Sequence, residues 1–250
     1  PYAELVRTYS TVPIRSLEEL NDNAQIRIAG MVNTFTQKFS KNSGKQFGIL
    51  LLEDLDLVSR PVNYITYDVA SNDGAEHDVQ IYFEAAPDWA RNSSEQKCVS
   101  ERGNDDNFNY VKSGTVDQKI LGRKGDDVRI DWGYFYMAAD KASSRSSVGN
   151  AVAMRREFAD RGTVEGRSEG DRMAITAPLG TVSGKGKSGY VMVGYDDIYS
   201  IQYFGENIRP YWNRNGNSSI AKQFAAAAKD YKSLMKRCAA FDAELMKEAN

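Results

Sequence analysis

The sequence predicts a mainly β protein, an antiparallel β sandwich followed by one long C-terminal α-helix. Short segments of alternating apolar and polar residues recur between turns rich in Gly, Asn and Asp, as at residues 62–70 and 77–85. After residue 217, apolar residues recur instead at three- and four-residue intervals, which is the period of an amphipathic helix. An aromatic content of 11%, with 14 Tyr, is typical of well-filled sheets.

Composition excludes several classes of protein. A hydrophobic content of 41% and a charged content of 26% are those of an ordinary globular chain of 250 residues. A net charge of -2 argues against a general nucleic-acid-binding surface, and no apolar run is long enough to cross a membrane. Cys98 and Cys238 have no metal-site spacing, so we expect no metal and no cofactor, and their pairing in a disulfide stays open.

Residues 1–53 form the first predicted domain, a partial β-meander. Residues 25–35 alternate as a half-buried strand, and residues 47–52 return as a second strand. The connection at residues 41–45, KNSGK, predicts a basic hairpin tip.

Residues 54–215 form the second predicted domain, the sandwich. The turn Ser71-Asn-Asp-Gly74 between two alternating segments predicts a β-hairpin of residues 62–70 and 77–85. Residues 90–109 are polar and rich in turn residues, residues 143–150 read as a Ser-rich surface segment, and residues 148–160 as a short helix. Further strands are predicted at residues 111–114, 116–121, 127–131, 133–139, 173–178 and 189–194.

Residues 216–250 form the third predicted segment, one amphipathic helix that begins a helical domain. Asn217 or Ser218 is the expected N-cap. Cys238 falls on the apolar stripe and is therefore expected in the core. The stripe comprises Ile220, Phe224, Ala227, Tyr231, Leu234, Cys238, Phe241 and Leu245.

The candidate cleft lies at residues 191–217, the most aromatic part of the chain. Asp196 and Asp197, with Glu206 ten residues on, are the best acid cluster for acid–base work or cation binding. The alternative is that these carboxylates cap strands or pair with Arg209 and Arg214. The full set is Asp196, Asp197, Tyr199, Tyr203, Glu206, Arg209, Tyr211 and Trp212.

The sequence does not assign catalytic residues. The single histidine, His77, lies in a predicted strand with Asp78 on the opposite face, and a solvent-facing role is the favoured reading. No Ser-His-Asp or Cys-His constellation can be assembled from this chain.

The first resemblance covers about the first fifth of the chain. The run IRIAGMVNTFTQKFSKNSGKQFGILLLED resembles the opening strands of the OB-fold in bacterial replicative DNA polymerase III alpha subunits. An OB barrel needs five strands, and no later segment continues the pattern. The resemblance implies that Lys38, Lys41, Lys45 and Phe47 contact single-stranded nucleic acid, and a soluble hairpin with a basic tip is the favoured alternative.

The second resemblance covers residues 54–250. The phrases DLDLVSRPVNYITYDVASNDGAEHDVQIYFEAAPDWA, GRKGDDVRIDWGYFYMAAD and VMVGYDDIYSIQYFGENIRPYWNR resemble the glutaminase A family. The resemblance implies the second half of a β-supersandwich and the first helix of a barrel-like helical domain, an architecture shared with six-hairpin glycosidases. It also implies amide hydrolysis of glutamine, or of a small-molecule or glycan-like substrate, by a secreted or periplasmic parent.

Two expectations follow from these resemblances together. The chain starts at Pro1 without Met or a leader and ends inside a predicted helix, so we expect a fragment whose missing helical barrel domain is its partner. The character of the sequence changes near residues 53–57, which predicts a hybrid chain, and a sequencing read across that join would test it. The expected function is a largely non-catalytic sandwich domain of a glutaminase A-like hydrolase, with a nucleic-acid-binding module or a purely structural domain as alternatives.

Overall fold

The computed structural model describes residues 10–11, 21, 25–28, 32–39, 46–52, 54–125 and 128–249. The chain divides into two compact units, Pro1–Arg60 and Pro61–Asn250.

The first unit contains one antiparallel pair of strands within its described residues, β1 (Val32–Phe39) and β2 (Gln46–Leu52). The short helix α2 (Leu55–Val58) follows, and the Asp54 carboxylate caps it by accepting a 3.1 Å hydrogen bond from the Leu57 N–H. The first strand therefore begins later than the predicted residue 25, because residues 25–28 have no regular structure.

The residues predicted to contact nucleic acid are only partly described. Lys38 and Phe47 are backbone partners in the β1–β2 ladder, whereas Lys41 and Lys45 lie outside the described residues. The OB-fold resemblance and its nucleic-acid contacts stay predictions.

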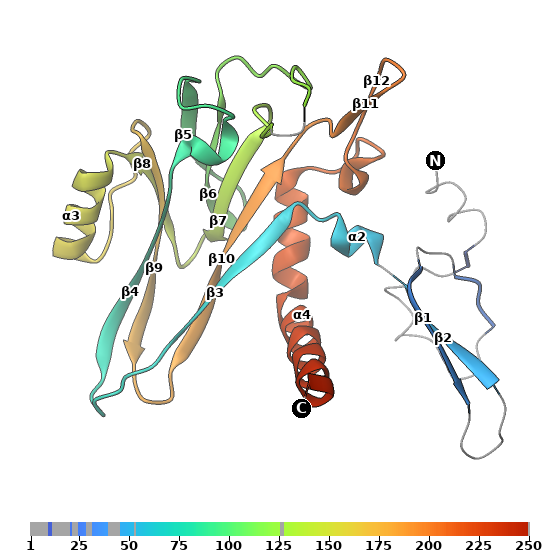
Figure 1. The fold of residues 1–250 in the computed structure, drawn as a ribbon. Coiled ribbons are helices and arrows are strands. Elements are labelled where there is room, and N and C mark those ends of the chain that lie inside the picture. The colour runs from blue at the N-terminus through green and yellow to red at the C-terminus, as the bar shows by residue number, and fades with distance from the viewer. Residues whose placement is uncertain are drawn as a thin grey trace. The chain divides into compact units, whose positions relative to one another are not determined.

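The second unit is a sandwich of two antiparallel sheets (Figure 1). The larger sheet has the strand order β3-β10-β7-β6-β5. Its strands are β3 (Val62–Val69), β5 (Cys98–Asn104), β6 (Phe108–Thr115), β7 (Tyr134–Asp140) and β10 (Lys187–Asp196).

The smaller sheet has the order β4-β9-β8, built from β4 (His77–Ala85), β8 (Arg145–Gly149) and β9 (Arg172–Val182). Alternate residues of both sheets point inward and form the main core, which buries large apolar side chains between the layers. This core contains Val111, Phe135, Met137, Val148, Met173, Ile175 and Val191.

Helix α3 (Ala151–Arg161) covers part of the outer face of the smaller sheet. The Asn150 side chain caps its start by accepting a hydrogen bond from the Ala153 N–H (3.1 Å), and Gly162 ends it at φ +69°. The buried Met154 packs with Val164 and Ala174. The short 3₁₀ helix η2 (Pro87–Ala90) follows β4.

Helix α4 (Ile220–Ala249) covers the outer face of the larger sheet with its first half only. Ser219 caps it, since its hydroxyl accepts a 3.3 Å hydrogen bond from the Lys222 N–H, so the predicted cap was one or two residues too early. The hydroxyl of Tyr64 on β3 donates to the Ala227 carbonyl at 2.7 Å. The core under the helix contains Val62, Phe108, Ala138, Met192, Ile220, Phe224 and Ala227.

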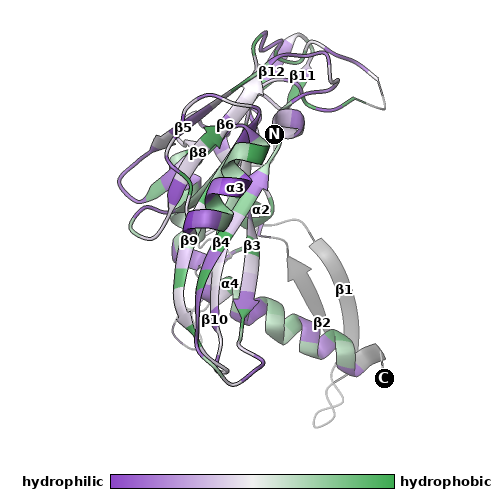
Figure 2. Cartoon of the chain, turned by 90° about the vertical axis from the view of Figure 1, so that its left-hand side faces the viewer, coloured by the Kyte–Doolittle hydropathy of each residue, from purple (hydrophilic) through white to green (hydrophobic). Residues whose placement is uncertain are grey.

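The second half of α4 lies open to solvent. Phe241 is 63% exposed and Leu245 is 53% exposed, so apolar and polar residues alike face water there (Figure 2). Cys238 is exposed as well, so the expectation that it lies in the core was wrong. Cys98 and Cys238 are both free thiols.

The mainly β fold with a long C-terminal helix is confirmed, but the strand pairing differs from the predicted local hairpin. β3 and β4 belong to different sheets, where β3 pairs with β10 and β4 pairs with β9. The chain therefore crosses between the two sheets four times, after β3, β4, β7 and β9. The first crossing, at residues 70–76, meets the last, at residues 183–186, where the Ser71 N–H donates to the Ser183 carbonyl at 3.1 Å.

Other local predictions also need correction. The polar segment 90–109 contains β5, and the supposed surface segment 143–150 contains β8, where Ser146, Ser147 and Val148 are buried. Residues 116–121 and the described residues 128–131 form turns and irregular chain rather than strands. No helix in the described part of the chain is both long and apolar enough to cross a membrane.

Candidate functional site

The candidate site lies where β10 ends and the chain turns toward α4. Trp132, which precedes β7 and is 7% exposed, holds the backbone of this turn through two hydrogen bonds. Its indole N–H donates to the carbonyls of Asp197 (2.8 Å) and Tyr199 (3.0 Å). The loop after β10 is therefore held to the chain before β7 through its backbone.

Gly133 allows the chain before β7 to lie close to the backbone at the end of β10. Its φ is +76°, and a Cβ at this position would lie 2.0 Å from the Asp196 carbonyl oxygen. The Gln118 side chain binds both backbone groups of this residue. Its Oε1 accepts a hydrogen bond from the Gly133 N–H (2.7 Å), and its Nε2 donates one to the Gly133 carbonyl (3.0 Å). Only glycine satisfies both the backbone angle and the contact.

Asp196 is half-buried at the end of β10. One carboxylate oxygen accepts a 3.0 Å hydrogen bond from the Ile198 N–H, which closes a tight turn. Burial raises the pKa of this carboxyl above its ordinary value, and the charge of Asp197 raises it further, against the opposing influence of the Ile198 N–H and Arg209. Asp196 therefore keeps its proton to a higher pH than an exposed aspartate does.

Asp197 is bound differently, because its carboxylate accepts a hydrogen bond from the Ser200 hydroxyl. The predicted ion pair with Arg209 is not formed within the described part of the chain. The Arg209 guanidinium lies 5.1 Å from the centre of the Tyr199 ring instead. Both aspartates accept hydrogen bonds within this turn, Asp196 from the Ile198 N–H and Asp197 from the Ser200 hydroxyl.

Glu206, Tyr203 and their neighbours project on a short hairpin, β11 (Ile201–Tyr203) and β12 (Glu206–Ile208). Phe204 and Gly205 have φ of +46° and +85°, the signature of a type I′ turn. Tyr203 is 60% exposed and Phe204 is 90% exposed, and their rings meet edge to face with centroids 4.5 Å apart. Glu206 is thus on an exposed finger, whereas the two aspartates lie at its base.

The remaining two residues of the predicted cleft lie in the 3₁₀ helix η3 (Tyr211–Asn213). Trp212 is 8% exposed and therefore belongs to the packing beneath the site. The Arg214 guanidinium lies 4.0 Å from the centre of the Tyr211 ring and donates to the Tyr211 carbonyl at 2.8 Å. One face of the Tyr211 ring is therefore covered by Arg214.

His77 does not contribute to this site. It begins β4 beside Val182, at the end of the sandwich opposite to that where Asp196 ends β10. Its Nε2 lies 3.0 Å from the Asp73 carboxylate, and the side chain is 52% exposed, in agreement with the solvent-facing prediction. Among the described residues, no group of three or more His, Cys, Asp or Glu side chains is placed to hold a metal ion.

Asp131 is a structural residue that the sequence did not reveal. It is 2% exposed, and its Oδ2 accepts hydrogen bonds from Arg123 Nε (2.6 Å) and Gln96 Nε2 (2.8 Å). Its charge raises the pKa of the neighbouring Tyr195, an effect second to that of burial. Arg123 and Asp131 lie in the connection from β6 to β7 and Gln96 lies in the loop before β5, so no local pattern points to the three together.

The site therefore offers one carboxyl group whose pKa is raised above its ordinary value by burial, beside an exposed aromatic finger. The fold defines a class: an antiparallel sandwich with α3 on one outer face and α4 on the other. The model of the family described as "Domain of unknown function (DUF5127)" matches residues 47–248. The chain belongs to this family.

The chain is also similar in sequence to an individual protein of known name. The chain is 26% identical to "Glutaminase A" of Aspergillus oryzae (strain ATCC 42149 / RIB 40) over 151 residues, which is 60% of this chain. The same alignment is 22% of the relative, so the chain spans about a fifth of that protein's length. The family match begins at residue 47, within β2.

Proposed function

We propose that this chain is the sandwich part of a glutaminase A-like hydrolase whose activity is amide hydrolysis of glutamine. The supporting observations are the family match over residues 47–248 and the distant likeness to Glutaminase A. The predicted secreted or periplasmic location of the parent belongs to the same proposal.

In this proposal the chain shapes the substrate site but does not complete it. Amide hydrolysis needs a nucleophile or activated water, a base, and donors for the developing oxyanion. The single observation that carries the role of the chain is Asp196, a half-buried carboxyl group with a raised pKa at the base of an exposed finger. A carboxyl group of that kind suits proton donation to a leaving amine.

The remaining groups come, in the proposal, from a helical domain that packs beside the site. The exposed apolar residues on the second half of α4, the half remote from the site, support a further packed domain on this unit, because such a stripe is stabilised by a covering surface. Residues of the finger and of η3 then form one wall of the substrate cleft.

The test is ammonia release from glutamine by two proteins. The purified chain alone is expected to be silent, and turnover by it would contradict the proposal that the chain does not complete the site. The second protein is a chimera in which this chain replaces the matching segment of the Aspergillus oryzae protein, and it is expected to release ammonia.

The chimera also carries the matched variants. Asp196→Asn keeps the acceptor for the Ile198 N–H but cannot donate a proton as an acid, so kcat is expected to fall about 100-fold. Glu206→Gln alters an exposed carboxylate and is expected to leave kcat within about twofold. Equal activity of both variants would remove Asp196 from the mechanism.

A further inference from the structure

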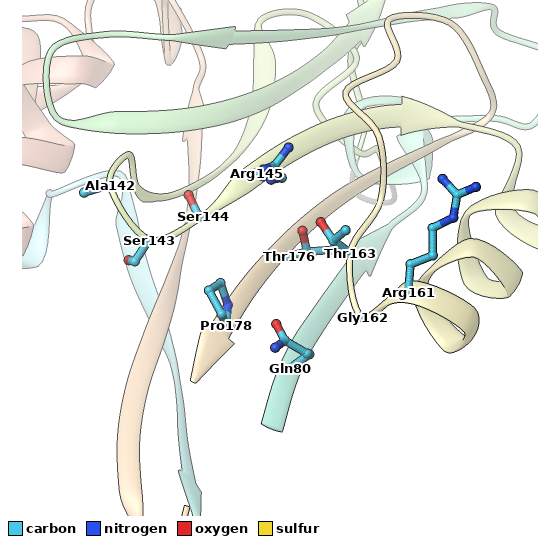
Figure 3. A pocket seen from close by; sticks show the side chains of 10 residues that line it. All are labelled: Gln80, Ala142, Ser143, Ser144, Arg145, Arg161, Gly162, Thr163, Thr176 and Pro178. Atoms are coloured by element: carbon cyan, nitrogen blue, oxygen red, sulfur yellow. The ribbon is translucent and has the colours of Figure 1, made fainter. Parts of the chain in front are cut away.

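The outer face of the smaller sheet is only partly covered by a helix. Tyr82 on β4 lies under α3, where its ring centre is 4.9 Å from that of Phe158. Past Gly162 the helix ends, and the same face of the sheet continues with Gln80 on β4 and Thr176 on β9. A cavity of about 370 Å³ lies there, bounded by this face, by the end of α3 and by the turn from β7 to β8 (Figure 3).

The turn that walls this cavity is held by hydrogen bonds. The Asp140 Oδ1 accepts from the backbone N–H groups of Ala142 (2.9 Å) and Ser143 (3.1 Å). The Ser144 hydroxyl donates to the Asp140 carbonyl at 2.6 Å, and Asn109 Nδ2 donates to the Ser144 carbonyl at 2.8 Å. The wall is therefore pre-formed, as binding sites for small molecules usually are.

The cavity lining holds two arginines, Arg145 and Arg161, and no carboxylate. The Arg161 guanidinium forms ion pairs with Glu157 (3.9 Å) and Glu165 (3.5 Å). It points away from the other lining side chains (Figure 3). The guanidinium of Arg145 makes no ion pair or hydrogen bond with any residue that the structure describes. One uncompensated positive charge therefore lies at the edge of the cavity.

A buried hydroxyl lies beside that charge. Thr176 is the register partner of Arg145 across the β8–β9 ladder and is 4% exposed. It lines the cavity, and its hydroxyl has no hydrogen-bond partner among the described residues. Because this hydroxyl opens onto the cavity, it is available to donate a hydrogen bond to a ligand atom there.

We propose that this cavity binds a small molecule through a single carboxylate group. The Arg145 guanidinium receives the carboxylate, the Thr176 hydroxyl donates to it, and the Gln80 amide and Thr163 hydroxyl contact the remainder of the ligand. One guanidinium fork matches one carboxylate in charge and in geometry, whereas a phosphate dianion calls for a second free cation. The site is independent of the proposed hydrolase activity, because it lies on the smaller sheet and uses none of the residues of the candidate site.

The test is an NMR titration of the ¹⁵N-labelled full chain with butyrate, with butyramide as its neutral isostere, and with inorganic phosphate. Butyrate is expected to give saturable shifts in the backbone amides of residues 142–145, 176 and 177, butyramide none, and phosphate weaker ones. Shifts of equal size with butyramide, no saturation with butyrate, or tighter binding of phosphate would each overturn the proposal.

Two variants complete the experiment. Arg145→Met removes the exposed free cation and is expected to weaken butyrate binding tenfold or more, since charge-assisted hydrogen bonds are the strong ones. Arg161→Met removes the cation that is already paired and is expected to change the affinity less than twofold. Unchanged binding in a folded Arg145→Met chain, as judged by its unshifted spectrum elsewhere, would refute the assignment.

Discussion

Truncation of Phe224 tests how α4 is attached to the sandwich. Phe224 is 3% exposed and packs between the larger sheet and the helix. Its ring centre lies 6.3 Å from those of Phe108 and Tyr136. Removing a buried phenyl group loses its transfer free energy and leaves a cavity, so Phe224→Ala is expected to lower the free energy of unfolding by about 3–5 kcal/mol.

The same helix supplies the matched control. Phe241 is 63% exposed on the far half of α4, so Phe241→Ala is expected to change the free energy of unfolding by no more than about 0.5 kcal/mol. Both variants exchange Phe for Ala in one helix, so the change in intrinsic helix propensity is shared and cancels between them. The difference between the variants therefore measures the docking of the first half alone.

The assay is urea unfolding followed by tryptophan fluorescence. All 3 tryptophans, Trp89, Trp132 and Trp212, lie in the unit Pro61–Asn250, so the signal reports on the sandwich and not on the N-terminal unit. The corresponding fall in Tm for Phe224→Ala is roughly 10 °C for a unit of this size. A loss below about 1 kcal/mol, or equal losses in both variants, would refute the packing described here.

Three further predictions concern the candidate site and the thiols. Asp196 has a raised pKa in the folded state, so its contribution to stability is greatest at low pH and is lost as the pH rises through that pKa. Asp196→Asn should therefore be more stable than the natural chain at pH 7, with the advantage vanishing below about pH 4, as measured by urea unfolding at each pH; a constant advantage would contradict the burial of this carboxyl. Trp132→Phe removes one donor shared by two backbone carbonyls and should cost about 1–3 kcal/mol and speed amide exchange in residues 197–200; exchange rates like those of the natural chain would show that the loop is held by other contacts. Cys238 should react with a disulfide reagent at pH 8 well before Cys98, whose pKa is raised by burial, and a single fast phase for both thiols would count against the packing of β5.

The sequence predicted the class of fold because its periodicities are local. Strand β4 coincides with the predicted residues 77–85, and α3 and α4 begin and end close to the predicted bounds. Strand pairing could not be predicted in this way, because the partner of β3 depends on the inward-facing side chains of strands far along the chain. The Asn-Asp-Gly turn reads as a hairpin turn, yet the strands on either side of it each have a longer partner in β9 or β10.

Polarity explains why β5 and β8 were missed. Strand β5 carries Ser, Glu, Arg and Asn as an edge strand of the larger sheet, and β8 buries serine side chains through hydrogen bonds, as when the Ser147 hydroxyl donates to the Glu165 carbonyl at 2.8 Å. Aromatic density singles out residues 191–217 as the candidate site, but it could not separate the buried Trp212 from the exposed Phe204. The cavity at Arg145 draws on several separate segments and has no signature in the sequence.

The repeated crossing between the sheets constrains how the chain folds as it leaves the ribosome. Strands β3 and β4 emerge early, but their partners β9 and β10 begin only at Arg172 and Lys187. Until then both strands expose unpaired edges, and neither sheet can close without the other because each crossing links the two. Co-translational folding of this unit must therefore wait for nearly its whole length, and the unpaired strand edges stay open to wrong pairing until then.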